Sequence, residues 1–165
     1  MNTLHPYIAA LAERTGLPLT VSLGGSFMAL IGGKRLLVKM LDNSDAILFY
    51  MEVGRPSLFY RGDVLSSLMG GNLFLAETKG AALSYDASNE MVGLNLILPL
   101  HHLGNEEFIN AMDNVIAAVE YWGNTLEALN AESAERSRQA GSESTSENPG
   151  QASTAPSGMD HMLRI

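Results

Sequence analysis

The chain has no cysteine among its 165 residues and is poor in basic side chains. Without thiols it can form no disulfide framework, thiolate metal site or cysteine nucleophile, and it suits a reducing compartment. Its 10 Lys and Arg stand against 18 Asp and Glu, which gives a formal net charge of −8. A negative charge of this size disfavours phosphate backbones and anionic membrane surfaces as partners. We therefore expect no nucleic-acid partner and no membrane partner.

Long apolar runs and a basic leader are also missing. The first residues, MNTLHPYIAALAERTG, lack the basic start and the continuous apolar core of a signal peptide. Charged residues interrupt every other apolar run before it reaches membrane-spanning length. We expect a cytoplasmic protein that is not exported, and the chain length supports one domain with one core.

The usual catalytic and metal-binding patterns do not occur. His101 and His102 are adjacent, so in an extended segment they point to opposite sides, and no acidic residue at helical spacing completes a metal site. None of the three Gly-Gly pairs belongs to a phosphate-loop pattern, and there is no G-x-S-x-G elbow. Glu106 and Glu107 diverge by about 100° on a helix and fit a dipole-stabilised first turn. We expect no enzyme, no cofactor and no metal.

The composition changes near Ala131. From there to the end the chain is rich in Ser, with Gly, Pro, Gln and Glu and few apolar residues. Such a segment buries too little surface to offset the entropy cost of ordering it. We predict a folded domain over residues 1–130 and a disordered Ser-rich tail over residues 131–165, with the apolar end 159–165 either frayed or docked on another surface.

Apolar periodicity and turn residues predict the secondary structure of the body. A glycine pair and an Asp/Asn/Ser cluster separate three strands, as in an antiparallel meander. Residues 19–23 form a further short strand or an irregular lead-in, and residues 72–77 are either irregular or helical. The expected elements are a helix from Thr3 to Gly16, strands at 26–31, 35–40 and 46–53, a helix at 63–69, strands at 80–86 and 91–98, and a helix from Asn105 to about Asn130.

The chain carries more apolar residues than one sheet face needs. In all three meander strands, both alternating sets of positions are apolar for several residues. Either helices cover both faces of the sheet or the outer face meets a partner. The nine methionines favour a partner, because their unbranched side chains suit surfaces that accept varied apolar ligands. Gly70-Gly71 interrupts another apolar stretch, either as a helix stop or as a close approach of two backbones at a subunit interface.

The order and spacing of these motifs resemble the class I type III secretion chaperone family, the CesT/Tir-chaperone-like group of small acidic homodimers. The resemblance runs from Leu4 to Leu129. It implies an α+β fold of the order α-βββ-α-ββ-α, with an antiparallel sheet and three helices. The matching motifs are Leu4-x3-Ile8-x2-Leu11, Phe27-x2-Leu30, Leu65-x2-Leu68-Met69-x2-Asn72-Leu73-Phe74, Gly80-x2-Leu83-Ser84-Tyr85-Asp86 with Leu94 to Leu100, and Phe108 to Trp122-x3-Leu126.

The resemblance also implies a function, which is binding without catalysis. Such a chaperone binds the N-terminal region of a secreted effector in extended form and keeps it soluble and secretion-competent in the bacterial cytoplasm. Two rival interpretations remain: a YbjN-like regulatory or general protein-interaction module, and a carrier of small apolar ligands. The implied effector-binding residues, with the outward strand face undecided, are Ile8, Leu11, Phe27, Met28, Leu30, Leu36, Val38, Leu48 and Tyr50. The implied dimer interface is Leu65, Leu68, Met69, Leu73, Phe74, Leu83 and Tyr85.

Overall fold

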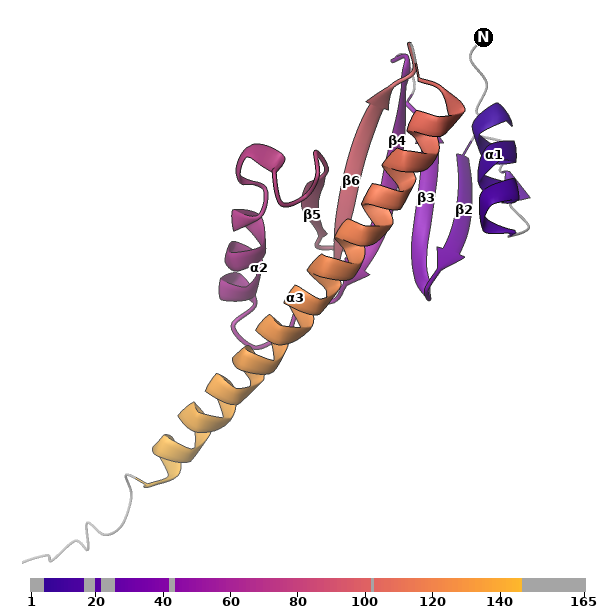
Figure 1. Ribbon diagram of the computed structural model, residues 1–165. Helices are drawn as coiled ribbons and strands as arrows, with labels where there is room; N and C mark the ends of the chain where they lie inside the picture. Colours follow the sequence, from indigo (N-terminus) through magenta and orange to yellow (C-terminus); the bar gives the residue numbers. More distant parts are fainter. Residues whose placement is uncertain (1–4, 17–19, 22–25, 42–43, 102, 147–165) are drawn as a thin grey trace, which may run out of the picture.

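The computed structural model describes residues 5–16, 20–21, 26–41, 44–101 and 103–146. These residues form an antiparallel sheet with α-helices packed against it (Figure 1). In chain order the elements are α1 (His5–Thr15), β1 (Thr20–Val21), β2 (Ser26–Ile31), β3 (Lys34–Met40), β4 (Ala46–Gly54), α2 (Arg61–Gly70), the 3-10 turn η1 (Leu73–Leu75), β5 (Ala82–Asp86), β6 (Met91–Pro99) and α3 (Asn105–Ser146).

This architecture confirms the predicted α+β class and the predicted order of helices and strands. For residues 19–23 the sequence allowed either a short strand or an irregular lead-in, and the structure places the short strand β1 within this segment. After α2 the helix does not resume, because Phe74 in η1 has a left-handed backbone with φ 57°. Thr3, Leu4, His102 and the Gly24-Gly25 pair lie outside the described residues.

The sheet has the strand order β1-β2-β3-β4-β6-β5 with antiparallel neighbours. Its register aligns Phe27, Val38, Phe49 and Leu96 across four strands, so these side chains share one face. β1 is much shorter than β2 and pairs only with Phe27 and Met28.

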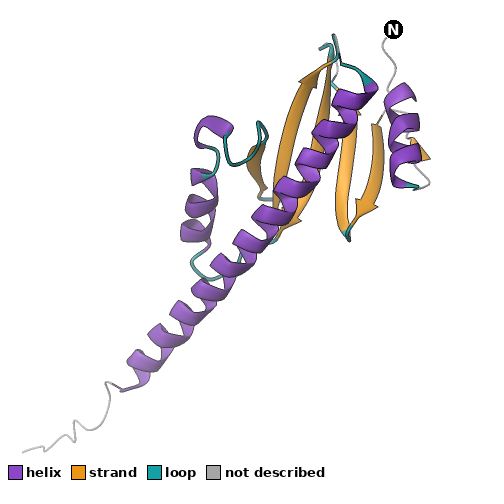
Figure 2. Ribbon diagram, viewed as in Figure 1, coloured by secondary structure: helices purple, strands orange, loops and turns teal. Residues whose placement is uncertain are grey.

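Buried residues from all three helices meet that aligned face in one core. Phe108 of α3 stacks between α1 and the sheet, with ring centroids 5.0 Å from Tyr7 and 5.1 Å from Phe49. α3 lies across this inner face (Figure 2). Within the described residues no helix covers the opposite, outer face of the sheet. The sequence left two alternatives: helices on both faces of the sheet, or an outer face that meets a partner. In the described part of the chain, the outer face is left uncovered.

Packing within the chain accounts for one glycine of the Gly70-Gly71 pair, Gly71. A Cβ atom at Gly71 would lie 2.0 Å from Cη2 of Trp122, a buried residue of α3. The close approach is therefore made within the chain, by an indole ring rather than by a second backbone. At Gly70 nothing lies within 4 Å of an added Cβ.

The predicted end of α3 at Asn130, and the predicted start of a disordered tail at Ala131, were wrong. α3 continues to Ser146, and its last turns project beyond the sheet (Figure 1). The sequence at 131–140 is rich in Ala, Glu, Arg and Gln, which favour helix. Residues 147–165 lie outside the described residues.

The extension of α3 also packs against the segment around α2. Arg136 donates to Asp63 at 3.0 Å, and its guanidinium lies 4.3 Å from the ring centroid of Tyr60. The Asn130 amide donates to the carbonyl of Arg55 at 3.0 Å and accepts from the N–H of Ser57 at 2.6 Å. These tertiary contacts compensate for the small amount of apolar surface that the extension buries.

Candidate protein-binding site

The outer face of the sheet carries an apolar band that no described element covers. The register places Leu48 opposite Ile97, and Leu37 opposite both Met28 and Tyr50. Three side chains at the ends of this band are largely exposed: Met28 at 60%, Leu30 at 67% and Ile97 at 57%. We call Met28, Leu30, Leu37, Leu48, Tyr50 and Ile97 the outer face.

Polar groups border the outer face toward the turn that joins β2 to β3. Arg35 and Glu52 form an ion pair at 3.5 Å. The ring of Tyr50 lies directly over Gly93 on β6, since a Cβ there would be 2.2 Å from Tyr50 Cε2. Burial raises the pKa of the Tyr50 hydroxyl, and the negative charge of Glu52 raises that pKa further. Tyr50 is thus a neutral aromatic side chain at the edge of the apolar band.

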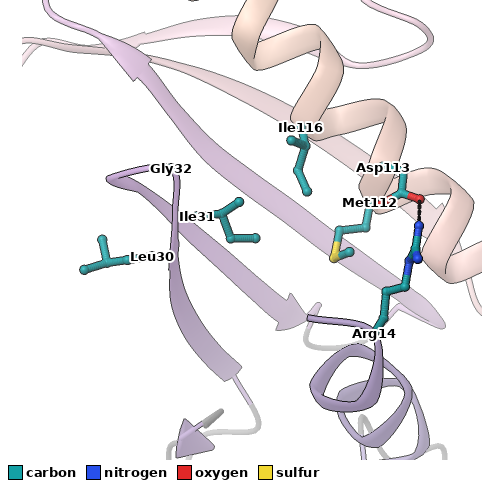
Figure 3. A pocket seen from close by; sticks show the side chains of 7 residues that line it. All are labelled: Arg14, Leu30, Ile31, Gly32, Met112, Asp113 and Ile116. Atoms are coloured by element: carbon teal, nitrogen blue, oxygen red, sulfur yellow. Dashed lines mark hydrogen bonds and ion pairs between the residues drawn. The ribbon is translucent and has the colours of Figure 1, made fainter. Parts of the chain in front are cut away.

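A groove of about 420 Å³ lies between α1, α3 and the turn that joins β2 to β3. Its lining residues are Arg14, Leu30, Ile31, Gly32, Met112, Asp113 and Ile116 (Figure 3). Figure 3 shows Ile31 and Leu30 on opposite sides of β2, so Leu30 belongs both to the rim of the groove and to the outer face.

The groove has an ion pair on its rim. Arg14 on α1 and Asp113 on α3 lie 3.5 Å apart, and both side chains are well exposed. Such a pair contributes at most about 1 kcal/mol, so a ligand can open it easily.

A second exposed apolar area surrounds α2. Residues 58–60 precede the helix and residues 73–75 follow it, and all six are exposed large apolar or aromatic side chains. Phe74 is 90% exposed, and both Phe74 and Leu75 have left-handed backbones with φ 57° and 55°. That conformation costs roughly 1–2 kcal/mol for each non-glycine residue. The turn therefore holds Phe74 in a strained backbone conformation while its side chain stays exposed.

Comparison with protein families places these surfaces in a known context. Residues 7–123 match the model of the Tir chaperone protein (CesT) family, which is well over half of the chain. The chain belongs to this family. No curated protein sequence matches it significantly. Within the described residues of this CesT-family chain, no helix is both long enough and apolar enough to cross a membrane.

Solved structures share the fold of this CesT-family chain. A chain of the ExsC–ExsE complex matches with a TM-score of 0.66 and 20% identity, covering 74% of this chain and 92% of that one. A chain of the crystal structure of the Yersinia pestis type III secretion chaperone SycH, in complex with a stable fragment of YscM2, matches with a TM-score of 0.56 and 14% identity. The match covers 75% of this chain and 99% of that one. A chain of the Pseudomonas aeruginosa type III secretion complex ExoU–SpcU matches with a TM-score of 0.54 and 18% identity, covering 74% of this chain and 95% of that one.

The structure divides the residues that the sequence assigned to effector binding. Met28, Leu30, Leu48 and Tyr50 lie on the outer face. The other five are core residues, so the prediction of a surface role is wrong for them in the isolated chain: they are Ile8, Leu11, Phe27, Leu36 and Val38. The physical reason is strand alternation, because in each strand one of the two apolar sets must face the helices.

Sequence reasoning also missed members of both surfaces. Leu37 and Ile97 belong to the outer face, and Met112 and Ile116 belong to the groove. Alternation carries a signal for Ile97, because β6 places Leu94, Leu96 and Leu98 on the inner face and Ile97 between them. No comparable signal exists for the groove, whose residues come from three separate segments.

The residues assigned to a dimer interface are divided in the same way. Met69, Leu73 and Phe74 are exposed. Leu65 and Tyr85 are half-buried. Leu68 and Leu83 belong to the core of the isolated chain, so their side chains are not available at its surface for a dimer contact. Four exposed residues beside α2 were missed: Leu58, Phe59, Tyr60 and Leu75.

Proposed function

We propose that this chain is a type III secretion chaperone that acts as a homodimer in the bacterial cytoplasm. It binds the N-terminal region of a cognate secreted effector in extended form and keeps that effector soluble and competent for secretion. The observation that carries the proposal is the apolar outer face, whose Met28, Leu30 and Ile97 are each more than half exposed. Family membership supports it, and so do the similar structures, which include SycH with a fragment of YscM2.

The groove between α1, α3 and the turn that joins β2 to β3 provides a place for an extended segment. Alternate side chains of such a segment can point into the groove, where Ile31, Met112 and Ile116 offer apolar contact. The apolar lining of the groove favours aliphatic side chains.

Beyond the groove the same segment can cross over Leu30 onto the outer face. Full burial of a side chain such as Met or Ile that starts exposed contributes about 1.5–3 kcal/mol. The outer face therefore offers a driving force without any catalytic group. The acidic net charge of −8 suits a neutral or basic segment and keeps the chaperone soluble.

Binding assays with charged substitutions test this proposal. The chain is co-expressed with proteins encoded next to it, and complexes are isolated by size-exclusion chromatography and measured by calorimetry. Met28→Glu and Ile97→Glu on the outer face should each weaken effector binding at least about tenfold, or about 1.4 kcal/mol. Tyr121→Glu on α3, a residue 55% exposed, is the matched control and should leave binding unchanged.

Circular dichroism and melting temperatures confirm that each variant is folded. Equal effector affinity for the two outer-face variants and the control would remove the outer face from the proposal. The absence of a complex with any secreted protein from the source organism would remove the chaperone function itself.

A further inference from the structure

An exposed apolar surface lies just before α2, where the extension of α3 packs against the chain. Its three residues are consecutive, and the side chains of Leu58, Phe59 and Tyr60 are 73%, 56% and 40% exposed. We call them the 58–60 patch. Contiguous apolar patches on a soluble chain usually mark a contact surface. The dimer interface that the family resemblance implies begins only at Leu65, so it does not account for this patch.

The 58–60 patch is held in place by the extension of α3. Asn130 binds the backbone of Arg55 and Ser57 through its side-chain amide. The guanidinium of Arg136 lies 4.3 Å from the ring centroid of Tyr60. A surface that is already fixed loses little conformational entropy when another segment binds it.

The chain itself contains a short apolar segment that can cover the 58–60 patch. From Ala131 to Gly158 the sequence has no Val, Ile, Leu, Met or aromatic residue. Residues 159–165, MDHMLRI, then bring four large apolar side chains together: Met159, Met162, Leu163 and Ile165. Their removal from water provides a driving force for binding a nearby apolar surface.

The length of the linker favours the 58–60 patch over the surfaces proposed for the effector. Arg136 precedes the end of α3 at Ser146 by ten residues, or about 15 Å along the helix. The twelve residues 147–158 can span at most about 43 Å, and a coil of that length typically spans about 20 Å. The groove at Met112 and Ile116 lies about 45–51 Å back along α3. The outer face lies on the side of the sheet away from α3 (Figure 2). The patch is therefore the surface within easy reach.

Charges beside the patch complement those of the segment. Arg55 and Glu132 are exposed, and neither belongs to an ion pair within the described residues. Arg55 shortly precedes the patch, and Glu132 lies on α3 beside the first turn of α2. The segment carries one acidic residue, Asp160, and one basic residue, Arg164. Exposed charge pairs of this kind add little affinity but fix the orientation of a contact.

We propose that residues 159–165 bind the 58–60 patch of the same chain. The contact covers the patch and leaves the outer face and the groove open for an effector, so it goes beyond the proposed function and needs neither an effector nor a second copy. A short tether supplies an effective concentration on the order of 1 mM, so even a weak contact is populated in dilute solution. The extension of α3 and residues 159–165 both lie beyond the family match to residues 7–123. This additional part of the chain thus brings the patch and the segment that covers it close together.

Disulfide formation within one chain tests the contact, because the sequence has no cysteine of its own. His161→Cys keeps the four apolar side chains and both charges of the segment. Combined with Leu58→Cys, it should form an intrachain disulfide at least about tenfold faster than when it is combined with Tyr121→Cys. Tyr121 is 55% exposed on α3 and lies outside the patch, so that pair measures chance encounters of the tethered segment. A third pair with Phe74→Cys, a site 90% exposed at the other end of α2, should also be slow.

A matched pair of charge substitutions tests whether apolar contact holds the segment in place. Leu163→Asp should slow the disulfide between positions 58 and 161 at least about tenfold. Ser157→Asp, which adds the same charge to the linker, should leave that rate unchanged. In the chain without added cysteines, Leu163→Asp should also raise the fluorescence of a dye that binds exposed apolar surface, while the circular dichroism spectrum stays that of the wild type.

Several results would overturn the proposal. Equal disulfide rates for the three cysteine pairs, or the fastest rate for the pair with position 74, would show that the segment does not bind the 58–60 patch. A disulfide between positions 58 and 161 that joins two different chains would place the segment on a second copy. Equal rates for Leu163→Asp and Ser157→Asp would show that apolar contact does not hold it. Each of these results leaves the proposed chaperone function standing, because the outer-face variants test that function separately.

Discussion

Replacing Gly71 by alanine tests the packing that joins α2 to α3. The backbone at this position has φ −64° and ψ −17°, which alanine adopts without strain. Judged by backbone preference alone, the substitution should stabilise the protein by up to about 1 kcal/mol. The contact with Trp122 has the opposite effect, because an added Cβ would lie 2.0 Å from Cη2 and 2.2 Å from Cζ2 of the indole.

The steric effect should dominate the backbone effect. Carbon atoms in contact are optimally about 3.5–4.0 Å apart, so the indole or α2 must move by more than about 1 Å. Trp122 is 3% exposed, and in the described structure its Nε1 has no hydrogen-bond partner, so packing alone sets its position. Overpacking of this kind costs about 1–3 kcal/mol. At about 2–4 °C per kcal/mol for a chain of this size, the melting temperature should fall by several degrees.

Gly70→Ala is the matched control, since it changes the adjacent residue in the same way. Nothing lies within 4 Å of a Cβ at Gly70, so the helix preference should act alone and stabilise the protein by up to about 1 kcal/mol. Urea unfolding is followed by the fluorescence of Trp122, the only tryptophan, and by circular dichroism. Each curve is recorded at several protein concentrations, because a dimer makes apparent stability depend on concentration.

A double-mutant cycle with Trp122→Phe isolates the contact, because the shorter ring withdraws the atoms nearest to Gly71. The cost of Gly71→Ala should then shrink by at least about 1 kcal/mol. Unfolding of the variants that lack the indole is followed by circular dichroism alone. If Gly71→Ala proves as stable as Gly70→Ala, or if its cost is the same with and without the Trp122→Phe substitution, the assignment of this glycine to the indole contact is refuted.

Three further predictions concern other parts of the molecule. Asn130→Ala should lower the free energy of unfolding by about 1–3 kcal/mol, because a backbone N–H and a carbonyl lose their partners. In the same urea titration, Asn124→Ala on the exposed side of α3 should change the free energy of unfolding by less than about 0.5 kcal/mol. Hydrogen bonds from Ser88 and then Asn89 lower the pKa of Asp86 to about 2; Ser88→Ala should raise that pKa in an NMR titration. Because the folded pKa lies below the unfolded one, the stability lost in this variant should be visible at neutral pH and vanish as the pH falls from about 4 to 2. Arg14→Ala, which removes an exposed ion pair, should change the unfolding free energy by no more than about 1 kcal/mol; a larger loss would show that the pair supports α1.

The sequence by itself determined the type and order of the elements. Apolar periodicity, the Gly32-Gly33 turn and the glycine after α2 act over a few residues, and local interactions of this range are legible without the fold. The pattern of those elements was also enough to identify the family. At the candidate site it marked four of the six outer-face residues, because they alternate along strands whose existence the sequence showed.

Only the tertiary structure decided which apolar side of each strand faces the helices. In β3 the adjacent residues Leu36 and Leu37 are both apolar, so alternation alone does not rank them, and the placement of α3 buries Leu36 and leaves Leu37 on the outer face. The same holds for the extension of α3. Its Ser-rich composition suggested disorder, although the residues at 131–140 favour helix. Contacts of Asn130 and Arg136 with residues more than seventy positions away fix the first turns of that helix against the segment around α2. Such contacts have no local signature, because they exist only once distant segments have been brought together by the core.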